Sequence, residues 1–368
     1  MRQNKSKTYW LKTFGCQANV ADSERIITAL ESKGYKAAKN AETAGVVIIN
    51  SCLVRESAEN RVYGLVNNLS KLKDKKIIIT GCLAGWALRD KKGKNLKILR
   101  KKTKNHASFV LTEDIADFSI RPSFLDDKMA WVPISNGCNN FCSYCIVPYA
   151  RGKETSRSEK EIIDDVKNRV KNGFSKITLL GQNVNSYGAD LKAKDKKLVT
   201  LVKSMGKKRI PTLFPHLLDS VAKIAGVELV DFMSSNPWDF SEELIETIAG
   251  NKNITRIIHL PLQSGNDQIL KKMNRNYTAK DYLALIEKIK SKVPKATFTT
   301  DIIVGFPGET KRQFENTVEV CKKVGFKKAY INKYSPRPNT PAEKLKNDVV
   351  PKEKKRRWQI LESLINSS

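Results

Sequence analysis

The chain has 368 residues, 40% of them hydrophobic, which is enough to bury the cores of about two or three domains. No stretch approaches about 18 consecutive apolar residues, and the first residues do not lead into a signal-peptide core. These features exclude membrane spans, and we expect a soluble, cytoplasmic protein. Lysine and arginine number 67 against 38 aspartates and glutamates, a net charge of +29. This surplus indicates a nucleic-acid-binding protein, unless it is only a solvated lysine-rich surface.

The first third of the chain alternates between short apolar runs and helical patterns. Thr8 to Phe14 is strand-like, and a helical stretch follows from Ser23, a suitable N-cap, to Gly34, a stop signal. Two further strands are expected at Gly45 to Asn50 and at Lys76 to Thr80. This alternation predicts a doubly wound parallel sheet.

A cysteine follows each of these strands within two residues of its end: Cys16, Cys52 and Cys82. The carboxyl ends of parallel strands share one edge, where ligands bind, so we expect the three thiols to converge there. Single buried cysteines are common core residues. Three at equivalent loop positions instead favour a three-cysteine site.

From about Lys128 onward, six further strands alternate with helical patterns, which predicts a parallel barrel or partial barrel. The expected strands are Trp131 to Ser135, Ile177 to Gly181, Val227 to Met233, Arg256 to Leu260, Thr297 to Val304 and Ala329 to Lys333. The loops after the strands form the active face of such barrels. These loops carry unusual sequences: NGCNNFCSYC, GQNVNSYG, SSNPWDF, PLQSGND, GFPGE and YSPRPNTP.

Much of the positive charge lies in three runs. Arg89 to Lys104 holds nine basic residues and one acid, Lys192 to Arg209 eight and one, and Lys352 to Arg357 five and one. Such runs indicate a polyanionic partner without saying which one, and many are simply solvated.

The first barrel loop holds Cys138, Cys142 and Cys145 at the spacing C-x3-C-x2-C. The chain has seven cysteines and no secretory signal, so clustered cysteines indicate metal or catalytic sites rather than disulfides. Three thiolates on a [4Fe–4S] cluster would leave one iron open for a substrate or cofactor. The alternative is a zinc site completed by a histidine, but all three histidines are remote in sequence: His106, His216 and His259.

This loop after the first barrel strand resembles the signature of radical S-adenosylmethionine (SAM) enzymes. The resemblance implies that the open iron chelates SAM, which is cleaved to give a 5′-deoxyadenosyl radical. It also implies that Tyr144 and the GFPGE segment, with Gly305 and Gly308, lie near the adenine. Taken alone, GFPGE is a tight strand-to-helix turn with Glu309 near a helix start.

Over nearly the whole chain, KTFGCQAN, NSCLVRESAE, TGCLAG and GCNNFCSYCIVPYARG resemble the methylthiotransferase family. The family implies a second [4Fe–4S] cluster on Cys16, Cys52 and Cys82, which donates sulfur. The segment ITLLGQNVNSYG is similar to the branch that converts isopentenyl-adenosine beside the tRNA anticodon to its 2-methylthio form. Sibling branches act on threonylcarbamoyl-adenosine of tRNA or on a ribosomal-protein aspartate.

The resemblance implies SAM or substrate contacts from four loop and strand residues: Gln182, Ser234, Gln263 and Asp301. Arg151 and Arg157 could meet tRNA phosphate or the cofactor carboxylate, or be solvated loop residues. RNA contacts are also expected from the end of the second basic run, at Lys207, Lys208 and Arg209. Cys321, at an apolar helical position, is expected to be a core thiol.

The expected architecture is an α/β protein with an N-terminal domain at 1–122, a radical SAM barrel at 128–350 and a basic helical tail at 351–368. The family's usual C-terminal RNA-binding β-barrel is expected to be absent. Further departures from the family pattern are Gly85, where glutamine is usual, Asn236, where histidine commonly precedes the proline, and Asn339, where glycine is usual.

The expected partners are the tRNA anticodon stem-loop, an electron donor such as flavodoxin or ferredoxin, and proteins that supply iron–sulfur clusters and sulfide. No membrane partner is expected. The competing hypothesis of another class is a non-catalytic iron–sulfur RNA-binding protein. It predicts RNA binding without 5′-deoxyadenosine formation.

Overall fold

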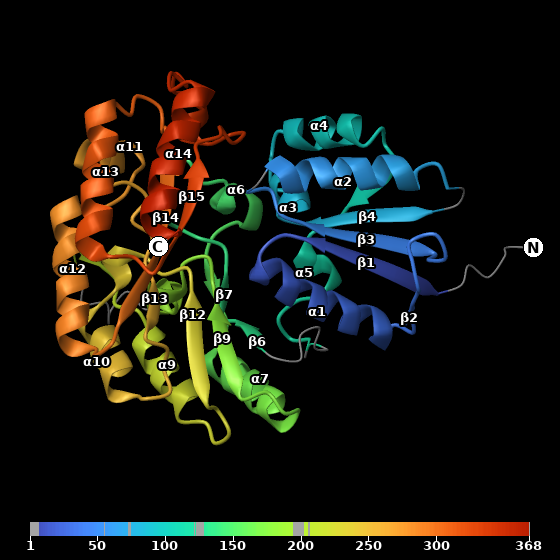
Figure 1. The fold of residues 1–368 in the computed structure, drawn as a ribbon. Coiled ribbons are helices and arrows are strands. Elements are labelled where there is room, and N and C mark those ends of the chain that lie inside the picture. Colours follow the sequence, from blue (N-terminus) through green and yellow to red (C-terminus); the bar gives the residue numbers. More distant parts are fainter. Residues whose placement is uncertain are drawn as a thin grey trace, which may run out of the picture. The chain divides into compact units, whose positions relative to one another are not determined.

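The computed structural model describes residues 7–54, 56–72, 75–120, 122, 129–193, 202–204 and 207–367. The chain forms two compact units (Figure 1). The first comprises Met1–Asn139 with Ile146–Asp165, and the second comprises Asn140–Cys145 with Val166–Ser368. Residues 123–128, where the first domain boundary is expected, lie outside the described residues, and the domain limits remain predictions.

The first unit is built on five parallel strands in the order β2-β1-β3-β4-β5. The strands are β1 (Thr8–Phe14), β2 (Lys36–Ala37), β3 (Val46–Ser51), β4 (Lys76–Gly81) and β5 (Ala107–Phe109). The chain order reverses between β1 and β3, and in doubly wound sheets ligands bind at such a switch point. The predicted doubly wound parallel sheet is confirmed.

Helices cover both faces of this sheet (Figure 1). One face carries α1 (Gln17–Ser32) and α5 (Thr112–Ile115), and the other carries α2 (Glu56–Leu69), α3 (Cys82–Leu88) and α4 (Lys94–Lys102). Side chains along β3 alternate between two cores, as the pleat of a strand requires. Val47 and Ile49 pack on the side of α2, α3 and α4, whereas Ile48 packs with Ile26 and Leu30 of α1.

Helix α1 begins well before the helix predicted from Ser23. Cys16, in extended conformation, is the N-cap, and Ser23 lies fully buried inside the helix. The Ser23 hydroxyl is hydrogen-bonded to Thr13 Oγ1 (2.8 Å) and accepts from Asn50 Nδ2 (2.9 Å). The predicted N-cap is therefore wrong, because tertiary partners rather than the helix end use this hydroxyl.

The first unit continues past the sheet with short elements. They are β6 (Ala130–Pro133), β7 (Ser135–Asn136), α6 (Val147–Arg151), β8 (Thr155–Ser156) and the start of α7 (Glu159–Lys171). Strands β7 and β8 pair in antiparallel fashion. They flank the chain segment that carries the C-x3-C-x2-C motif.

The second unit supplies five parallel strands, which with β6 are the six predicted from the sequence. They are β9 (Lys176–Leu180), β12 (Leu229–Met233), β13 (Ile257–His259), β14 (Thr297–Val304) and β15 (Lys328–Lys333). Strand β9 pairs with β12, and β14 pairs with β13 and β15, all in parallel. The predicted six-unit βα partial barrel is confirmed.

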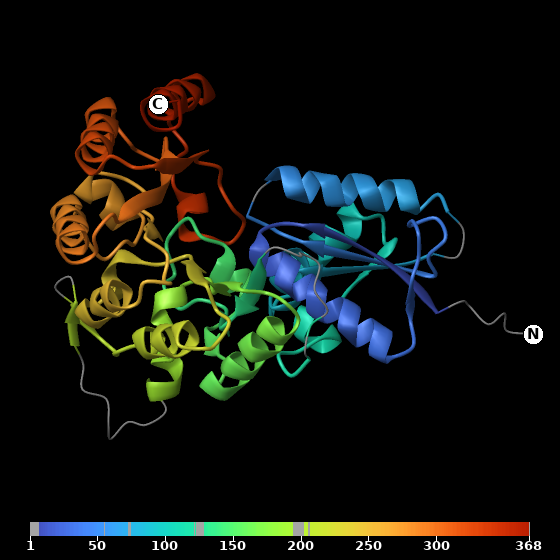
Figure 2. The same ribbon diagram turned by 60° about the horizontal axis from the view of Figure 1, so that its bottom comes forward.

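Helices follow these strands on the outer side. The α-helices are α8 (Ala189–Ala193), α9 (Phe214–Ala222), α10 (Glu242–Gly250), α11 (Asp267–Lys272), α12 (Ala279–Lys292), α13 (Lys311–Val324) and α14 (Pro351–Ile365). The 3-10 helices are η1 (Val184–Ser186), η2 (Pro237–Asp239) and η3 (Pro341–Lys344). In Figure 2 the orange and red helices α12, α13 and α14 cover the outer side of the orange and red strands. Within the described ranges, no helix combines the length and apolar character needed to cross a membrane.

The second basic run contributes a small antiparallel pair, β10 (Val202–Ser204) and β11 (Lys207–Arg209). The rest of that run between Lys192 and Arg209 lies largely outside the described residues, at 194–201, 205 and 206. The hairpin interrupts the βα alternation between η1 and α9. This strand pair is therefore an insertion into the βα alternation of the second unit.

Candidate functional site

The first cysteine set lies at the carboxyl edge of the N-terminal sheet. The strand register aligns Phe14 of β1 with Ser51 of β3, and Ser51 with Gly81 of β4. Cys52 and Cys82 follow this row directly, and Cys16 lies two residues past Phe14. The Cys52 N–H donates to the Phe14 carbonyl (2.6 Å), which ties the start of one loop to the neighbouring strand. The structure thus places the three cysteines along the carboxyl edge of three adjacent strands, beside the switch point between β1 and β3.

A buried amide cluster supports this edge. Asn50 donates to the Asn19 carbonyl (2.7 Å) and Asn19 donates to Asn50 Oδ1 (3.0 Å), which links β3 to α1. Gly81 has φ +80°, and a side chain there would overlap Asn50 Oδ1 and the Ser51 carbonyl. Only glycine fits this conformation and this space, so Gly81 fixes the path of the chain into Cys82.

Donors point at two of the three sulfurs. The Val54 N–H donates to Cys52 Sγ (3.2 Å), and Arg151 Nε donates to Cys82 Sγ (3.2 Å). Cys52 and Cys82 are buried, whereas Cys16 is exposed. Burial raises the pKa of the Cys82 thiol, and the Arg151 guanidinium opposes that rise. Hydrogen-bond donors at sulfur suit thiolates that ligate a metal cluster.

Arg151 and Arg157 are enclosed side chains with partners in the first unit. Arg151 is enclosed, since it also donates to Asp22 Oδ2 (2.8 Å) and Asn136 Oδ1 (3.0 Å). Arg157 is only 7% exposed, and it donates to Asp165 (3.1 Å) and to the Pro133 carbonyl (2.8 Å). Neither is a solvated loop arginine, and a contact of either with tRNA phosphate or with the cofactor carboxylate stays a prediction. The contact of Arg151 with Cys82 is one for which the sequence carries no signal.

The second cysteine set occupies the loop from Cys138 to Cys145. In the first unit the Cys138 N–H donates to the Gly152 carbonyl (3.2 Å). In the second unit, residues before Arg275 hold the loop. Ser143 donates through its N–H to the Met273 carbonyl (3.0 Å) and through its hydroxyl to the Lys272 carbonyl (2.7 Å).

Arg275 lies against this second set. Its Nη1 donates to Cys142 Sγ (3.4 Å), and its guanidinium carbon lies 4.4 Å from the Trp238 ring centre and 5.3 Å from that of Tyr277. Burial raises the pKa of the Tyr144 phenol; Arg275 opposes the rise and Cys142 adds to it. The segment KKMNRNYT has no metal or nucleotide motif, so sequence reasoning missed Arg275.

Tyr144 and the GFPGE turn share one apolar cluster. Tyr144 packs against a core that contains Phe306 from the turn, together with Met273 and Tyr334. In the turn, Gly305 has φ +69° and Gly308 φ +74°. Two segments that were predicted to border the same adenine are therefore parts of one cluster.

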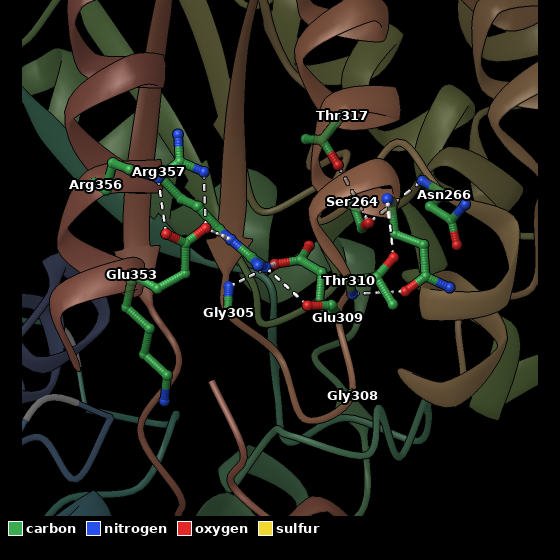
Figure 3. Close-up of polar contacts among 12 residues, drawn as sticks. Ser264, Asn266, Gly305, Gly308, Glu309, Thr310, Thr317, Glu353, Arg356 and Arg357 are labelled. Atoms are coloured by element: carbon green, nitrogen blue, oxygen red, sulfur yellow. Dashed lines mark hydrogen bonds and ion pairs between the residues drawn. The ribbon is translucent and has the colours of Figure 1, made fainter. Parts of the chain in front are cut away.

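The C-terminal helix holds this turn in place (Figure 3). Glu309 Oε2 accepts from the Gly305 N–H (2.7 Å) and from Arg357 Nη1 (2.6 Å), and Arg357 Nε donates to Glu353 (2.8 Å). Burial raises the pKa of Glu309, and the Gly305 N–H and Arg357 oppose that rise. The side chain of Lys354 fills the space in which Gly305 would carry a Cβ.

These contacts change the interpretation of the third basic run. Lys354 and Arg357 are buried, at 6% and 4% exposure. Lys354 donates to the Tyr334 carbonyl (3.0 Å), and Arg357 pairs with Glu309. Two of the five basic residues in this run are thus buried inside the second unit. The geometry of GFPGE is that of a tight strand-to-helix turn with Glu309 near the start of α13.

The remaining candidate residues lie within or after the strands of the second unit. Asp301 of β14 contacts His259 Nε2 (3.2 Å), and its carbonyl accepts from the Gln263 N–H (2.8 Å). Ser234 (φ +70°) and Gln263 (φ +66°) both have left-handed backbone. The loop after β9 starts near Gln182. A hydrogen bond links it to the loop after β12, because the Val184 N–H donates to the Ser234 carbonyl (3.1 Å).

Two further polar groups in these loops were not predicted. Asn183 Oδ1 and Ser235 Oγ are buried, and neither has a hydrogen-bond partner among the described residues. Asp231 of β12, which was not predicted either, accepts from the Phe232 N–H (2.8 Å); burial raises the pKa of its carboxyl, and this hydrogen bond and His259 oppose the rise. Buried polar groups without partners are where a polar ligand is expected to bind.

Among the described residues, no three His, Cys, Asp or Glu side chains converge closely enough to hold a single metal ion. The thiolates of an iron–sulfur cluster each bind a different iron, so they need not converge on one point.

The chain matches two protein families over most of its length. Residues 132–321 match the Radical SAM superfamily, and residues 8–99 match the uncharacterized protein family UPF0004.

Its relatives include two proteins named tRNA-2-methylthio-N(6)-dimethylallyladenosine synthase. The one from Caldicellulosiruptor saccharolyticus is 41% identical, over 99% of this chain and 79% of that protein. The one from Carboxydothermus hydrogenoformans is 40% identical, over 98% and 83%.

Solved structures share the fold. The radical SAM methyltransferase TsrM from Kitasatospora setae superposes with a TM-score of 0.60 at 13% identity, over 92% of this chain and 75% of that one. The cobalamin-dependent radical SAM enzyme OxsB gives 0.54 at 9%, over 96% and 56%. By these family matches and identities, the chain belongs to the radical SAM superfamily and, within it, to the family of tRNA-2-methylthio-N(6)-dimethylallyladenosine synthases.

Proposed function

We propose that this chain is a tRNA methylthiotransferase that attaches sulfur and a methyl group at carbon 2 of isopentenyl-adenosine next to the anticodon. The observation that carries the proposal is the presence of two separate three-cysteine sets in a radical SAM enzyme. Replacing an unactivated aromatic C–H bond by C–S requires both a radical generator and a sulfur atom within reach of it. One cysteine set is available for each task.

S-adenosylmethionine and a [4Fe–4S] cluster are the cofactors of a radical SAM enzyme, and the residues present fit them. Cys138, Cys142 and Cys145 would hold the cluster and leave one iron open. When bound, the cluster and SAM supply hydrogen-atom abstraction. Ser143 holds this loop through its hydrogen bonds to the Lys272 and Met273 carbonyls.

SAM would lie across the strand ends of the second unit. Tyr144 and the turn at Gly305 and Gly308 would border the adenine. Polar contacts would come from Gln182, Ser234, Gln263 and Asp301. The unpartnered Asn183 Oδ1 and Ser235 Oγ support a polar ligand in this region.

A second [4Fe–4S] cluster would be held by Cys16, Cys52 and Cys82 and would supply the sulfur. Donors at Cys52 and Cys82 and the exposure of Cys16 support this assignment. Gly81 and Asn50 keep these thiols at the sheet edge.

The substrate would be a tRNA anticodon stem-loop. The net charge of +29 favours phosphate contacts, and strand β11 consists of Lys207, Lys208 and Arg209. To expose carbon 2 of the adenine, the enzyme would unstack that nucleotide. Electrons would come from a flavodoxin or ferredoxin, and iron–sulfur and sulfide supply proteins would renew the second cluster.

The test is expression of this chain in a bacterial host whose own 2-methylthiolation is deleted, followed by mass spectrometry of tRNA nucleosides. We expect 2-methylthio-isopentenyladenosine. Its absence in cells where both clusters are loaded would refute the proposal, and a methylthiolated threonylcarbamoyl-adenosine would assign the chain to a sibling branch. Cys321→Ala is the matched control, since Cys321 is a buried thiol in α13 whose pKa burial raises to about 12.

A further inference from the structure

Arg275 is a buried cation without a carboxylate partner. It is 7% exposed, and its polar contacts are Cys142 Sγ, the Tyr277 hydroxyl and the Pro261 carbonyl, each at 3.4 Å. No aspartate or glutamate in the described part of the chain forms an ion pair with it. Buried charges are normally paired, so this guanidinium calls for an anion.

The surroundings of Arg275 identify the group that becomes that anion. The tyrosine hydroxyl and the carbonyl are neutral oxygens, and the Trp238 and Tyr277 rings offer only cation–π contact. Cys142 is the one polar partner of Arg275 that turns anionic when it ligates iron. An N–H to sulfur bond and a positive charge near a cluster both stabilise the extra electron of its reduced form.

We propose that Arg275 is a positioning residue that holds the Cys142 thiolate of the radical cluster and raises the reduction potential of that cluster. This rests on the proposed function, which makes Cys142 a cluster ligand. The redox step is the transfer of one electron from a low-potential donor to the cluster, with no bond made or broken. Arg275 shifts the equilibrium of that step toward the reduced cluster.

Arg151, at the first cysteine set, differs from Arg275 in having a carboxylate partner. Arg151 donates to Cys82 Sγ, but Asp22 pairs with the same guanidinium at 2.8 Å. Asp22 also pairs with Arg25 at 2.6 Å. The Arg151 charge is therefore shared with a carboxylate, whereas the Arg275 charge faces the sulfur without one.

The test is an EPR-monitored potentiometric titration of the anaerobically reconstituted full chain with dithionite as the reductant. The radical cluster is the signal that changes when SAM is added. We expect Arg275→Met to lower its midpoint potential, with a tenfold loss in the equilibrium constant of reduction appearing as about 59 mV for one electron. Lys271→Met is the matched control, because Lys271 is exposed on the same segment and carries the same charge.

The possible outcomes decide between the proposal and its alternatives. An unchanged midpoint potential in a loaded Arg275→Met protein would overturn the proposal. If Arg275→Met loads no radical cluster, the same titration is carried out on Arg275→Gln. A folded protein that still fails to load supports the positioning role, and loss of the fold in both variants would reduce Arg275 to a structural residue. Retention of the radical cluster in Cys142→Ala would refute the ligand assignment, and with it the proposed function, rather than the charge effect.

Discussion

The two cysteine sets are built by different means. Cys16, Cys52 and Cys82 come from three neighbouring strands, and only the register of the sheet brings them together. Cys138, Cys142 and Cys145 lie on one short loop, whose central residues are held by carbonyls of the segment before Arg275. The first cysteine set therefore depends on the folded sheet. The cysteines of the second set are close together because they are close in sequence. Disturbance of the N-terminal core should therefore damage the first set and spare the second.

The largest expected effect comes from removing one ligand in each set. We expect Cys138→Ala to abolish 5′-deoxyadenosine formation, because the radical cluster would lose one of three ligands. Cys52→Ala should leave that formation intact and abolish sulfur insertion. Both are measured by mass spectrometry of anaerobic reactions with SAM, dithionite and tRNA. Sulfur insertion by Cys52→Ala would show that the two sets do not divide the chemistry.

The next effect concerns the turn beside the second set. Arg357→Met leaves the buried Glu309 without its cation, which we expect to cost about 3–5 kcal/mol in free energy of unfolding. Arg356→Met is the control, since Arg356 is exposed and pairs only with Glu353. The double variant Glu309→Gln/Arg357→Met should recover part of the loss. Urea denaturation measures all four proteins, and equal losses for both arginines would contradict the buried pair.

A smaller effect should come from helix α3, which carries Cys82. Gly85 stands where the family commonly has glutamine, and a Cβ there would overlap the Ala150 carbonyl of α6. We expect Gly85→Gln to cost about 1–3 kcal/mol through overpacking and to lower the iron content of the first set. Gly64→Gln is the control, because Gly64 has open space around it. Gly93→Gln would not serve, because Gly93 has left-handed backbone. Gly64→Gln should leave the iron content unchanged.

The smallest effect is a pH dependence of stability that comes from Glu353 of α14. The hydrogen bond from Arg356 lowers the pKa of Glu353 from 4.5 to about 2; burial opposes this shift, and the hydrogen bond from Arg357 adds to it. Because the pKa is lower in the folded state, this carboxylate stabilises the fold above pH 4.5 and loses that effect as the pH falls toward 2. Glu353→Gln should thus cost roughly 0.2–1 kcal/mol at pH 7, and the difference from wild type should shrink below pH 4.5. A difference that is constant with pH, in denaturation at several pH values, would contradict this.

The sequence predicted what depends on local pattern. The strands before Cys16, Cys52 and Cys82 were visible as apolar runs, and the rules of parallel sheets then placed the three thiols at one edge. Cys138 to Cys145 were visible from their spacing alone. These are properties that each segment shows by itself.

The sequence could not predict pairings between distant side chains. Arg151 with Cys82 and Arg275 with Cys142 join residues 69 and 133 positions apart, and no periodicity marks them. The same limit explains the misinterpretation of the last basic run. Arg357 is a surface charge by composition, and only its distant partner Glu309 makes it a buried one.

The left-handed backbone at Ser234 and Gln263 has a thermodynamic consequence. A glycine would hold either conformation freely, whereas a residue with a Cβ is strained there by about 1–3 kcal/mol. Exchanging both for glycine should therefore yield a more heat-resistant protein. By keeping Ser234 and Gln263, the chain gives up some thermal stability. In return, a hydroxyl and an amide remain available for contacts at these two positions.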